Sequence, residues 1–177
     1  MKRKLAVDID NTIWDLITPW ITYYNNMFED NINYKDIVKY DFFDITKNAT
    51  KEQVLDILSL DGFWDSVVPY ETSKEYLSKL NTEYDLYIVT STSYKTSYKK
   101  FERFFGLFNF LREDQLIISS HKDIINVDII VDDFINHLSG DNHIKFLIDQ
   151  PYNQDVDDGP IIRVENLKQV YEYLQNN

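Results

Sequence analysis

The sequence predicts an α/β protein: a Rossmann-like parallel sheet with helices on both faces and a small helical cap inserted after the first strand. From Pro69 onward, short apolar runs typical of buried strands alternate with helix-spaced segments, which favours a parallel sheet. Between the first strand and about Tyr70 the patterns are helical only. We therefore predict a core domain of residues 1–14 and 71–177 and a cap domain of residues 15–70.

Composition limits the classes of protein that fit this chain. It has 177 residues, 44% of them hydrophobic and 15% aromatic, enough to bury a core. The net charge of −12 argues against general nucleic-acid binding, which needs a basic surface. The absence of cysteine excludes disulfides, thiolate nucleophiles and cysteine-ligated zinc. No apolar run has the length of a membrane span, and residues 1–4 lead into a strand rather than a signal sequence, so we expect a cytoplasmic protein.

The cap is predicted to contain three helices. Thr18 can cap the first, with Pro19 at its first position and aromatic residues following at helical spacing. Residues 33–38 form a short second helix. Residues 50–53 have the form of a capping box and open the third helix, which ends at residues 61–64 with a glycine as the stop signal.

The core is predicted to alternate strands with helices after its first strand. Short apolar runs bounded by polar residues are the strand candidates, and segments with helix-spaced apolar residues are the helix candidates. The predicted strands are 86–90, 116–118, 129–131 and 144–148. The predicted helices are 72–80, 93–105, which stops at a glycine, and 165–174.

The first strand, at the start of the chain, ends in two carboxylates, Asp8 and Asp10. Side chains alternate along a strand, so both would point the same way if the strand ran through both. Like charges at this spacing are costly unless a cation or a proton offsets them. Ligands bind at the carboxyl ends of strands in open parallel sheets. Alternatively, such a run of Asp, Asn and Thr marks only a turn or a helix cap.

Polar groups also follow three later strands. They are the hydroxyls of residues 90–93, Lys122 at the end of 119–122, and the pair Asp132 and Asp133. Hydroxyls can hold a phosphoryl oxygen, an ammonium can offset its charge, and carboxylates can hold magnesium. Together these groups predict phosphoryl transfer. Taken singly, the hydroxyls and the acidic pair could be helix caps, and the lysine could be a solvated loop residue.

The order and content of these motifs resemble the haloacid dehalogenase-like (HAD) phosphohydrolase superfamily over almost the whole chain. The four matching segments are 8–12, 89–91, Lys122 and 128–133. Within the superfamily the chain is most similar to the 5′(3′)-deoxyribonucleotidase family. The supporting features are the helical insertion, residues 62–64 followed by Pro69, the Thr90-Ser91 pair, and residues 121–123 and 131–133.

The resemblance implies a role for each acidic residue. Asp8 would attack phosphorus and form an aspartyl-phosphate intermediate, which divides one hard displacement into two easier ones. Asp10 would protonate the leaving oxygen and then activate water. Magnesium would be held by Asp8, the Asp10 backbone carbonyl and Asp133, with Asp132 as a neighbour.

The resemblance also implies the phosphate ligands and the activity. Thr90 and Ser91 would hydrogen-bond phosphate oxygens, and Lys122 would neutralise charge. Asn11 stands where the family usually has glycine, and asparagine tolerates the left-handed backbone that this place requires. We therefore expect a magnesium-dependent phosphomonoesterase that acts on nucleoside monophosphates, a small-molecule partner, with a homodimer left open.

Substrate choice is expected to depend on the cap, because the phosphate site is generic. The candidates for stacking on the base are Phe42, Phe43, Phe63 and Trp64, with Trp20 behind them. Stacking of a base on an aromatic ring is worth about 1–3 kcal/mol. The alternative is that most of these rings fill the cap's own core.

Other residues carry weaker indications. Arg163 and residues 150–153 could line the site from the sheet side. The histidines form no metal-ligand spacing and are interpreted as loop or surface residues: His121, His137 and His143.

Three other functions compete with the leading hypothesis. The nearest is another HAD-type phosphatase, acting on a sugar phosphate or on a polynucleotide 3′-phosphate, the latter disfavoured by the acidic charge. A phosphorylated-aspartate switch resembling receiver domains is a second, although here the acidic pair comes last and a helical insertion follows the first strand. The third is a binding module without catalysis, which the retention of every charged group disfavours.

Overall fold

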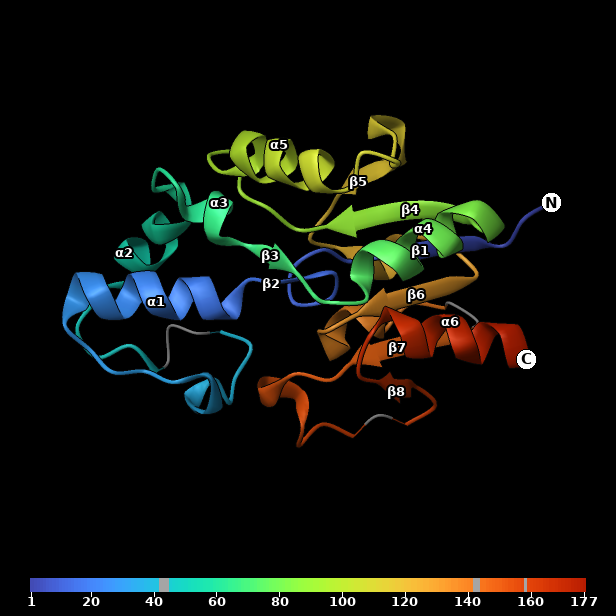
Figure 1. Cartoon of the computed structure of the whole chain (residues 1–177). Helices are drawn as coiled ribbons and strands as arrows, with labels where there is room; N and C mark the ends of the chain where they lie inside the picture. Colours follow the sequence, from blue (N-terminus) through green and yellow to red (C-terminus); the bar gives the residue numbers. More distant parts are fainter. Residues whose placement is uncertain (42–44, 142–143, 158) are drawn as a thin grey trace.

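The computed structural model of the chain describes residues 1–177 except 42–44, 142–143 and 158. A six-stranded sheet with the order β5-β4-β1-β6-β7-β8 forms its centre, and every strand pair in it is parallel (Figure 1). The strands are β1 (Lys4–Val7), β4 (Asp85–Thr90), β5 (Leu116–Ile118), β6 (Ile129–Asp132), β7 (Ile144–Ile148) and β8 (Ile162–Val164). The predicted α/β class is confirmed.

The first strand, β1, lies between β4 and β6 in the interior of the sheet. Its last residue, Val7, is opposite Ile88 of β4 and Val131 of β6. Because the three strands are parallel, the segments that follow them all leave the same edge of the sheet. The residues after β1, β4 and β6 are thereby brought together although they are far apart in the sequence.

Three helices cover one face of the sheet, α4 (Ser73–Glu83), α5 (Ser97–Leu107) and α6 (Leu167–Asn176). Their apolar residues join the larger core cluster with alternate strand residues such as Val7 and Val131. The strand residues between these, such as Ala6 and Ile130, form a smaller cluster on the other face, to which the short 3₁₀ segment η6 (Ile135–Leu138) contributes.

The cap consists of short helices that lie together beyond the sheet's carboxyl edge (Figure 1). They are α1 (Ile17–Phe28), η1 (Tyr34–Asp36), α2 (Lys51–Asp56), η3 (Ile57–Ser59) and α3 (Phe63–Ser66). The predicted capping box is present, because Gln53 N donates to Thr50 Oγ1 at 3.3 Å and Thr50 N donates to Gln53 Oε1 at 2.9 Å. The helix that this box opens is confirmed.

The structure corrects several predicted elements. Two two-residue strands, β2 (Trp14–Asp15) and β3 (Val68–Pro69), pair antiparallel where the cap joins the core, and they are too short to produce a sequence pattern. Gly62, predicted to stop a helix, has φ 77 and precedes α3. Helix α5 begins later than predicted and continues through Gly106. Strand β8 was not predicted, because an arginine interrupts its apolar run.

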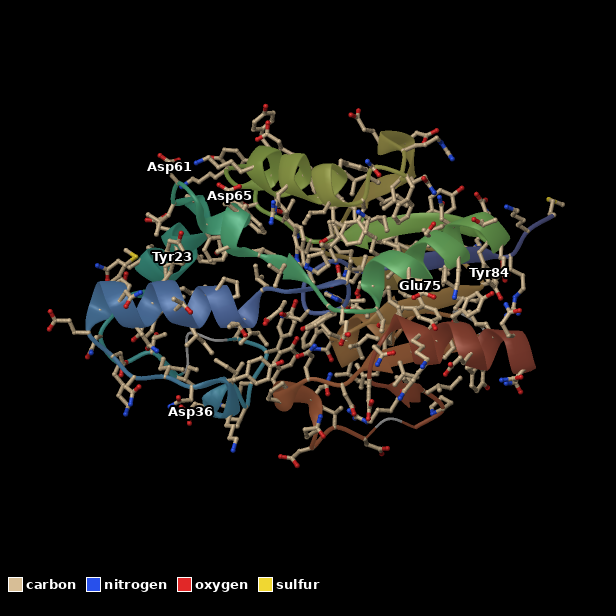
Figure 2. The ribbon with its side chains drawn as sticks, in the orientation of Figure 1. Tyr23, Asp36, Asp61, Asp65, Glu75 and Tyr84 are labelled. Carbon is tan, nitrogen blue, oxygen red and sulfur yellow. The ribbon has the colours of Figure 1, made fainter. Side chains whose placement is uncertain are left out.

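Helix α5 ties the cap to the core by polar contacts. Lys99 Nζ forms an ion pair with Asp61 Oδ1 at 2.5 Å. Arg103 donates to the backbone oxygens of Asp65 at 3.1 Å and Val67 at 3.3 Å. Figure 2 shows Asp61 and Asp65 on the part of the cap next to α5.

Among the described residues, no helix combines the length and apolar character that crossing a membrane requires.

Candidate active site

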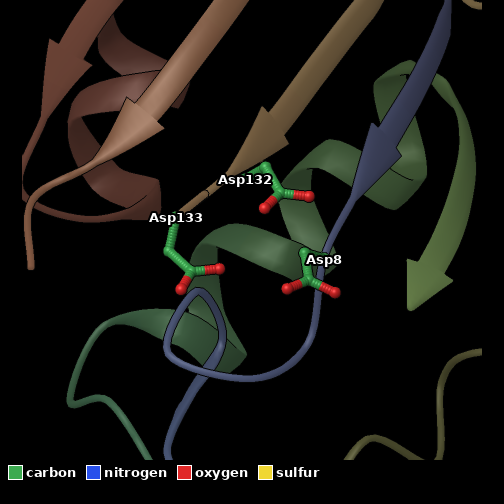
Figure 3. A group of neighbouring side chains, drawn as sticks. All are labelled: Asp8, Asp132 and Asp133. Atoms are coloured by element: carbon green, nitrogen blue, oxygen red, sulfur yellow. The ribbon is translucent and has the colours of Figure 1, made fainter. Parts of the chain in front are cut away.

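Three carboxylates meet at the carboxyl edge of the sheet, where β1 and β6 end (Figure 3). Asp8 follows β1, Asp132 is the last residue of β6, and Asp133 comes next. One oxygen of each lies within 4.8 Å of the others, and their exposed fractions are only 6%, 0% and 2%. Buried like charges at this spacing repel strongly, so the cluster requires a compensating cation or proton.

Lys122 supplies part of that compensation from the short segment η5 (Lys122–Ile124). Its Nζ lies 2.6 Å from Asp8 Oδ1 and 2.7 Å from Asp132 Oδ2. Burial alone would lower the pKa of Lys122, but Asp8 and Asp132 outweigh it and raise the pKa above its ordinary value. The lysine is therefore held as an ammonium between the two carboxylates.

Asp132 is fully engaged by hydrogen-bond donors. It accepts from Lys122 Nζ at 2.7 Å, from the backbone N–H of Phe134 at 2.9 Å, and contacts His137 Nδ1 at 3.0 Å. Burial would raise the pKa of Asp132, but Lys122 and then His137 outweigh it and hold the pKa below its usual range. Asp132 thus remains ionised and positions Lys122.

Asp8 and Asp133 are less well compensated. Burial raises the pKa of Asp8, and Asp132 and Asp10 add to this against the opposing effect of Lys122. Burial likewise raises the pKa of Asp133 well above its ordinary value, with Asp132 and Asp8 adding to it. Within the described part of the chain, Lys122 is the one group that compensates the buried Asp8 Oδ1, at 2.6 Å, and it shares its charge with Asp132. A cluster of three carboxylates that share one ammonium fits a hard divalent cation.

Asp10 lies in a turn rather than on β1, which ends at Val7, so the two carboxylates do not share a strand. Trp14 Nε1 donates to Asp10 Oδ1 at 2.8 Å, and Lys100 Nζ lies 2.5 Å from Oδ2. Asn11 in the same turn has φ 54, as expected for an asparagine in place of glycine. The turn redirects the chain so that Asp10 lies beside the site.

Lys100 of α5, which is only 1% exposed, was not predicted to belong to the site. Besides its contact with Asp10, its Nζ donates to Thr90 Oγ1 at 3.0 Å and to the backbone oxygen of Ser91 at 3.3 Å. A signal was present in the sequence, because Lys100 is one helical turn before Phe104 and therefore on the buried stripe of α5.

A cavity of about 150 Å³ contains most of the predicted site residues. Its lining consists of Asp8, Asp10, Asn11, Leu16, Tyr40, Thr90, Ser91, Lys122, Asp133 and His137. A second cavity of about 460 Å³ lies next to it and shares Asp10, Leu16 and Ser91 with it. Its remaining walls come from α2, η3 and Trp64 of the cap, from the segment between β4 and α5, and from Lys100 of α5. The small polar cavity thus opens beside a larger, mixed one.

Of the aromatic residues predicted to stack on the base, Trp64 is the only described one that lines either of these two cavities. Trp64 borders the larger cavity and donates its Nε1 to the Leu58 backbone oxygen at 2.8 Å. Phe63 is fully buried, with its ring centroid 5.4 Å from that of Tyr23. Trp20 is also buried and stacks on Tyr24. The two remaining candidates, Phe42 and Phe43, lie outside the described residues.

The burial of Phe63 gives a testable stability prediction. Phe63→Ala should lower the free energy of unfolding by about 3–5 kcal/mol, because it removes a ring from a closely packed core. Urea unfolding measures this change, with Tyr94→Ala as a control because Tyr94 is 85% exposed. Equal stability of the two variants would contradict the structural role of Phe63.

Two other groups differ from their predicted positions. His137 was interpreted as a loop or surface residue, but it lines the small cavity and contacts Asp132. The spacing of residues 132 and 137 alone gave no sign of this contact. Arg163, a candidate for lining the site, instead forms an ion pair with Asp149 at 2.7 Å and is not a wall residue of either cavity.

A cap inserted between the first two of four motifs, all converging on one edge of a parallel sheet, is the organisation of the HAD-like phosphohydrolases. Solved structures of that fold superpose on nearly the entire chain. A haloacid dehalogenase-like hydrolase from Burkholderia xenovorans gives a TM-score of 0.67 at 14% identity, covering 98% of this chain and 96% of that one. A HAD-hydrolase from Bacillus subtilis, described as bound to magnesium, gives a TM-score of 0.61 at 19% identity. The match covers 98% of this chain and 99% of that one.

The chain belongs to the family described as 5′ nucleotidase, deoxy (Pyrimidine), cytosolic type C protein, which matches residues 2–176. A 5′(3′)-deoxyribonucleotidase of Bacillus subtilis is 31% identical over 176 residues, covering 98% of this chain and 99% of the relative. One of Clostridium acetobutylicum is 26% identical over 153 residues, covering 86% and 85%. The resemblance found in the sequence is confirmed, and the chain is a hydrolase of the phosphatase class.

Proposed function

We propose that the chain is a magnesium-dependent phosphomonoesterase that hydrolyses deoxyribonucleoside or ribonucleoside monophosphates to nucleoside and phosphate. The observation that carries the proposal is the pair of adjoining cavities, one small and lined by three carboxylates and the proposed phosphate ligands, the other about three times larger. The small cavity suits a phosphoryl group and the larger one suits a nucleoside. The names of the relatives support the same substrate class.

In the first step, an oxygen of Asp8 attacks phosphorus and the bond from phosphorus to the ester oxygen breaks. Asp8 is suited to this role because it lines the small cavity and is oriented by Lys122, whose Nζ lies 2.6 Å from Asp8 Oδ1. The product is an aspartyl-phosphate and a leaving alkoxide that needs a proton.

Asp10 supplies that proton and then removes one from the attacking water, whose oxygen displaces the Asp8 carboxylate from phosphorus. Trp14 and Lys100 each donate to one Asp10 oxygen, which fixes the orientation of the carboxylate. The arriving phosphate offers Lys100 another acceptor, which would leave Asp10 Oδ2 free to carry the proton that it gives to the leaving oxygen.

The phosphate itself is held by residues from β4 and η5. Thr90 Oγ1 accepts from Lys100 at 3.0 Å, and its own hydroxyl makes a long hydrogen bond of 3.4 Å to the Ser91 backbone oxygen, which it can exchange for a phosphate oxygen. Ser91 lines both cavities and lies where the phosphate meets its leaving group. Lys122 offsets the negative charge that develops on the phosphoryl oxygens.

Asp8 and Asp133 fit Mg²⁺, and the Asp10 backbone carbonyl is the third ligand that we propose. The ion would offset the charge of the transferred phosphoryl group. Asp132 is less suited to direct coordination, because Lys122, Phe134 and His137 already engage its oxygens. Asp132 acts on the site by holding Lys122.

The two parts of the chain are proposed to have different roles, catalysis and recognition of the leaving group. We propose that residues 1–14 and 71–177 are the catalytic core and that residues 15–70 are a cap that recognises the leaving group. Trp64 borders the larger cavity and is available for the base, Tyr40 of the cap lines the small cavity, and Phe42 and Phe43 remain candidates. Because the family description includes the word cytosolic, we also propose a cytoplasmic location.

A substrate panel tests this proposal. The purified chain should release phosphate from deoxyribonucleoside 5′- and 3′-monophosphates faster than from sugar phosphates or from a 3′-phosphorylated oligonucleotide. EDTA should abolish the activity and Mg²⁺ should restore it, because the carboxylate cluster needs the cation. A preference for a sugar phosphate would favour the alternative HAD-type phosphatase, and activity unaffected by EDTA would contradict the proposed metal.

A further inference from the structure

The segment between β7 and β8 lies behind the acidic cluster, and the proposed mechanism does not use it. It contains η7 (Pro151–Asn153). The side chains of Gln150, Tyr152 and Asn153 are buried although all three are polar. Buried polar groups are costly unless they are hydrogen-bonded, so the partners of these residues indicate what the segment stabilises.

Tyr152 donates its hydroxyl hydrogen to Oδ2 of Asp133. Among the hydrogen bonds of the described residues, the other oxygen of this carboxylate, Oδ1, takes part only in a long one of 3.5 Å from Thr12 Oγ1. The two oxygens of Asp133 are therefore unequal, because one is held by a phenol and the other is left for the acidic cluster.

The tyrosine is itself held in place by its neighbour. Asn153 Nδ2 donates to the backbone oxygens of Asp133 at 2.9 Å and Ile148 at 2.8 Å. Arg163 in turn donates to Asn153 Oδ1 and to its backbone oxygen, both at 3.0 Å. These contacts fix the main chain on both sides of the Tyr152–Asp133 hydrogen bond, so the phenol cannot easily follow a rotating carboxylate.

Gln150 connects the same segment to the turn after Asp10. Its Nε2 donates to the Asn11 backbone oxygen at 2.6 Å, and its Oε1 accepts from Tyr34 of the cap at 2.8 Å. Residues 150–153 are therefore hydrogen-bonded to both segments that form the site. They contact the end of β6 through Asp133 and the turn after β1 through Asn11.

We propose that Tyr152 is a positioning residue that confines Asp133 to coordination through one oxygen, and that it thereby makes the site prefer Mg²⁺ to Ca²⁺. This inference rests on the metal of the proposed function. Mg²⁺ is small and requires near-octahedral geometry, whereas Ca²⁺ accepts more oxygens and often takes both oxygens of a carboxylate. A phenol that occupies Oδ2 opposes two-oxygen coordination and therefore disfavours the larger ion.

The experiment compares ion binding without substrate. The midpoint of thermal unfolding is measured against Mg²⁺ and, separately, Ca²⁺ concentration for the unaltered chain, Tyr152→Phe and Tyr171→Phe. Tyr171 is a matched control, because its hydroxyl also donates to a carboxylate, Glu83 at 2.7 Å, on the surface. Apparent dissociation constants follow from the concentration dependence of the midpoint.

Tyr152→Phe is expected to weaken Mg²⁺ binding about 10- to 100-fold, the usual effect of losing a hydrogen bond to a metal ligand. Ca²⁺ binding should weaken less or strengthen, so the preference for Mg²⁺ should fall at least about tenfold. Tyr171→Phe should leave both constants unchanged. A second variant, Tyr152→His, retains a ring N–H donor and should keep more of the preference than Tyr152→Phe.

Three outcomes would overturn the inference: an unchanged ratio of the two constants, an equal weakening of both ions as a merely structural role would give, or a Tyr152→His ratio below that of Tyr152→Phe. Should Tyr152→Phe not fold, Tyr152→His decides instead: a preference for Mg²⁺ below that of the unaltered chain supports the inference, and an unchanged preference overturns it. If the unaltered chain bound neither ion, the metal of the proposed function would fail as well. Binding by the unaltered chain with an unchanged ratio rejects the role of Tyr152 alone.

Discussion

Asp8→Asn is expected to abolish the hydrolysis of nucleoside monophosphates, with a fall in kcat on the order of 10³- to 10⁶-fold. An amide oxygen is a poor nucleophile, so the aspartyl-phosphate cannot form. The fold should survive, because the substitution removes one of three crowded negative charges while Lys122 keeps its partner Asp132. Phosphate release under saturating substrate measures the loss, and thermal unfolding measures the fold.

The matched control is Asp114→Asn, which removes a carboxylate that is exposed and lines neither of the two cavities. It should leave kcat unchanged. Substantial activity in Asp8→Asn, after mass spectrometry has excluded conversion of the asparagine back to aspartate, would show that another group attacks phosphorus.

Lys122→Met should both inactivate the chain and destabilise it. Removing one partner of a buried ion pair costs about 3–5 kcal/mol, because the remaining charge stays buried and unpaired. Here the substitution would leave Asp8 and Asp132 without their shared ammonium. Urea unfolding near pH 7 measures the loss, and Lys168→Met, whose exposed side chain lies 3.8 Å from Glu172, should change stability by less than about 0.5 kcal/mol.

The difference in unfolding free energy between the unaltered chain and Lys122→Met should depend on pH in a definite direction. The pKa of Asp132 is depressed in the folded chain, after Lys122 and His137 overcome burial, so its ionisation stabilises the fold above the ordinary pKa of 3.8. That contribution is lost as the pH falls through the depressed pKa. The gap in stability between the unaltered chain and Lys122→Met should therefore be large at pH 7 and shrink below about pH 4. A gap that stays constant across this range would contradict the ion pair as its cause.

Several site residues could be located from local sequence patterns because the sheet is parallel. Asp8, Thr90 and Asp133 each follow an apolar run, and the carboxyl ends of parallel strands lie on one edge. Their convergence therefore follows from strand order alone. The cap insertion was also predictable, since its capping box is a contact between residues only three apart.

Other residues of the site could not be found in this way. Lys100 reaches Asp10 across 90 positions of sequence, and Tyr152 reaches Asp133 from the far side of β7. His137 is near Asp132 in the sequence, but its contact depends on how η6 turns back onto the strand end. None of these contacts produces a periodic pattern in the sequence. Each contact depends on the tertiary packing, which determines the side chains that point inward.

The sequence by itself determined the α/β class and the helical segment after the first strand, and it singled out the carboxylates that we propose to react, since hydrophobic periodicity and short motifs are local properties of a chain. Only the tertiary structure decided that Asp132 holds Lys122, that Lys100 joins Asp10 to Thr90, and that Phe63 is buried in the core. The physical reason is that burial, and with it the strength of each charge interaction, depends on neighbours contributed by distant segments.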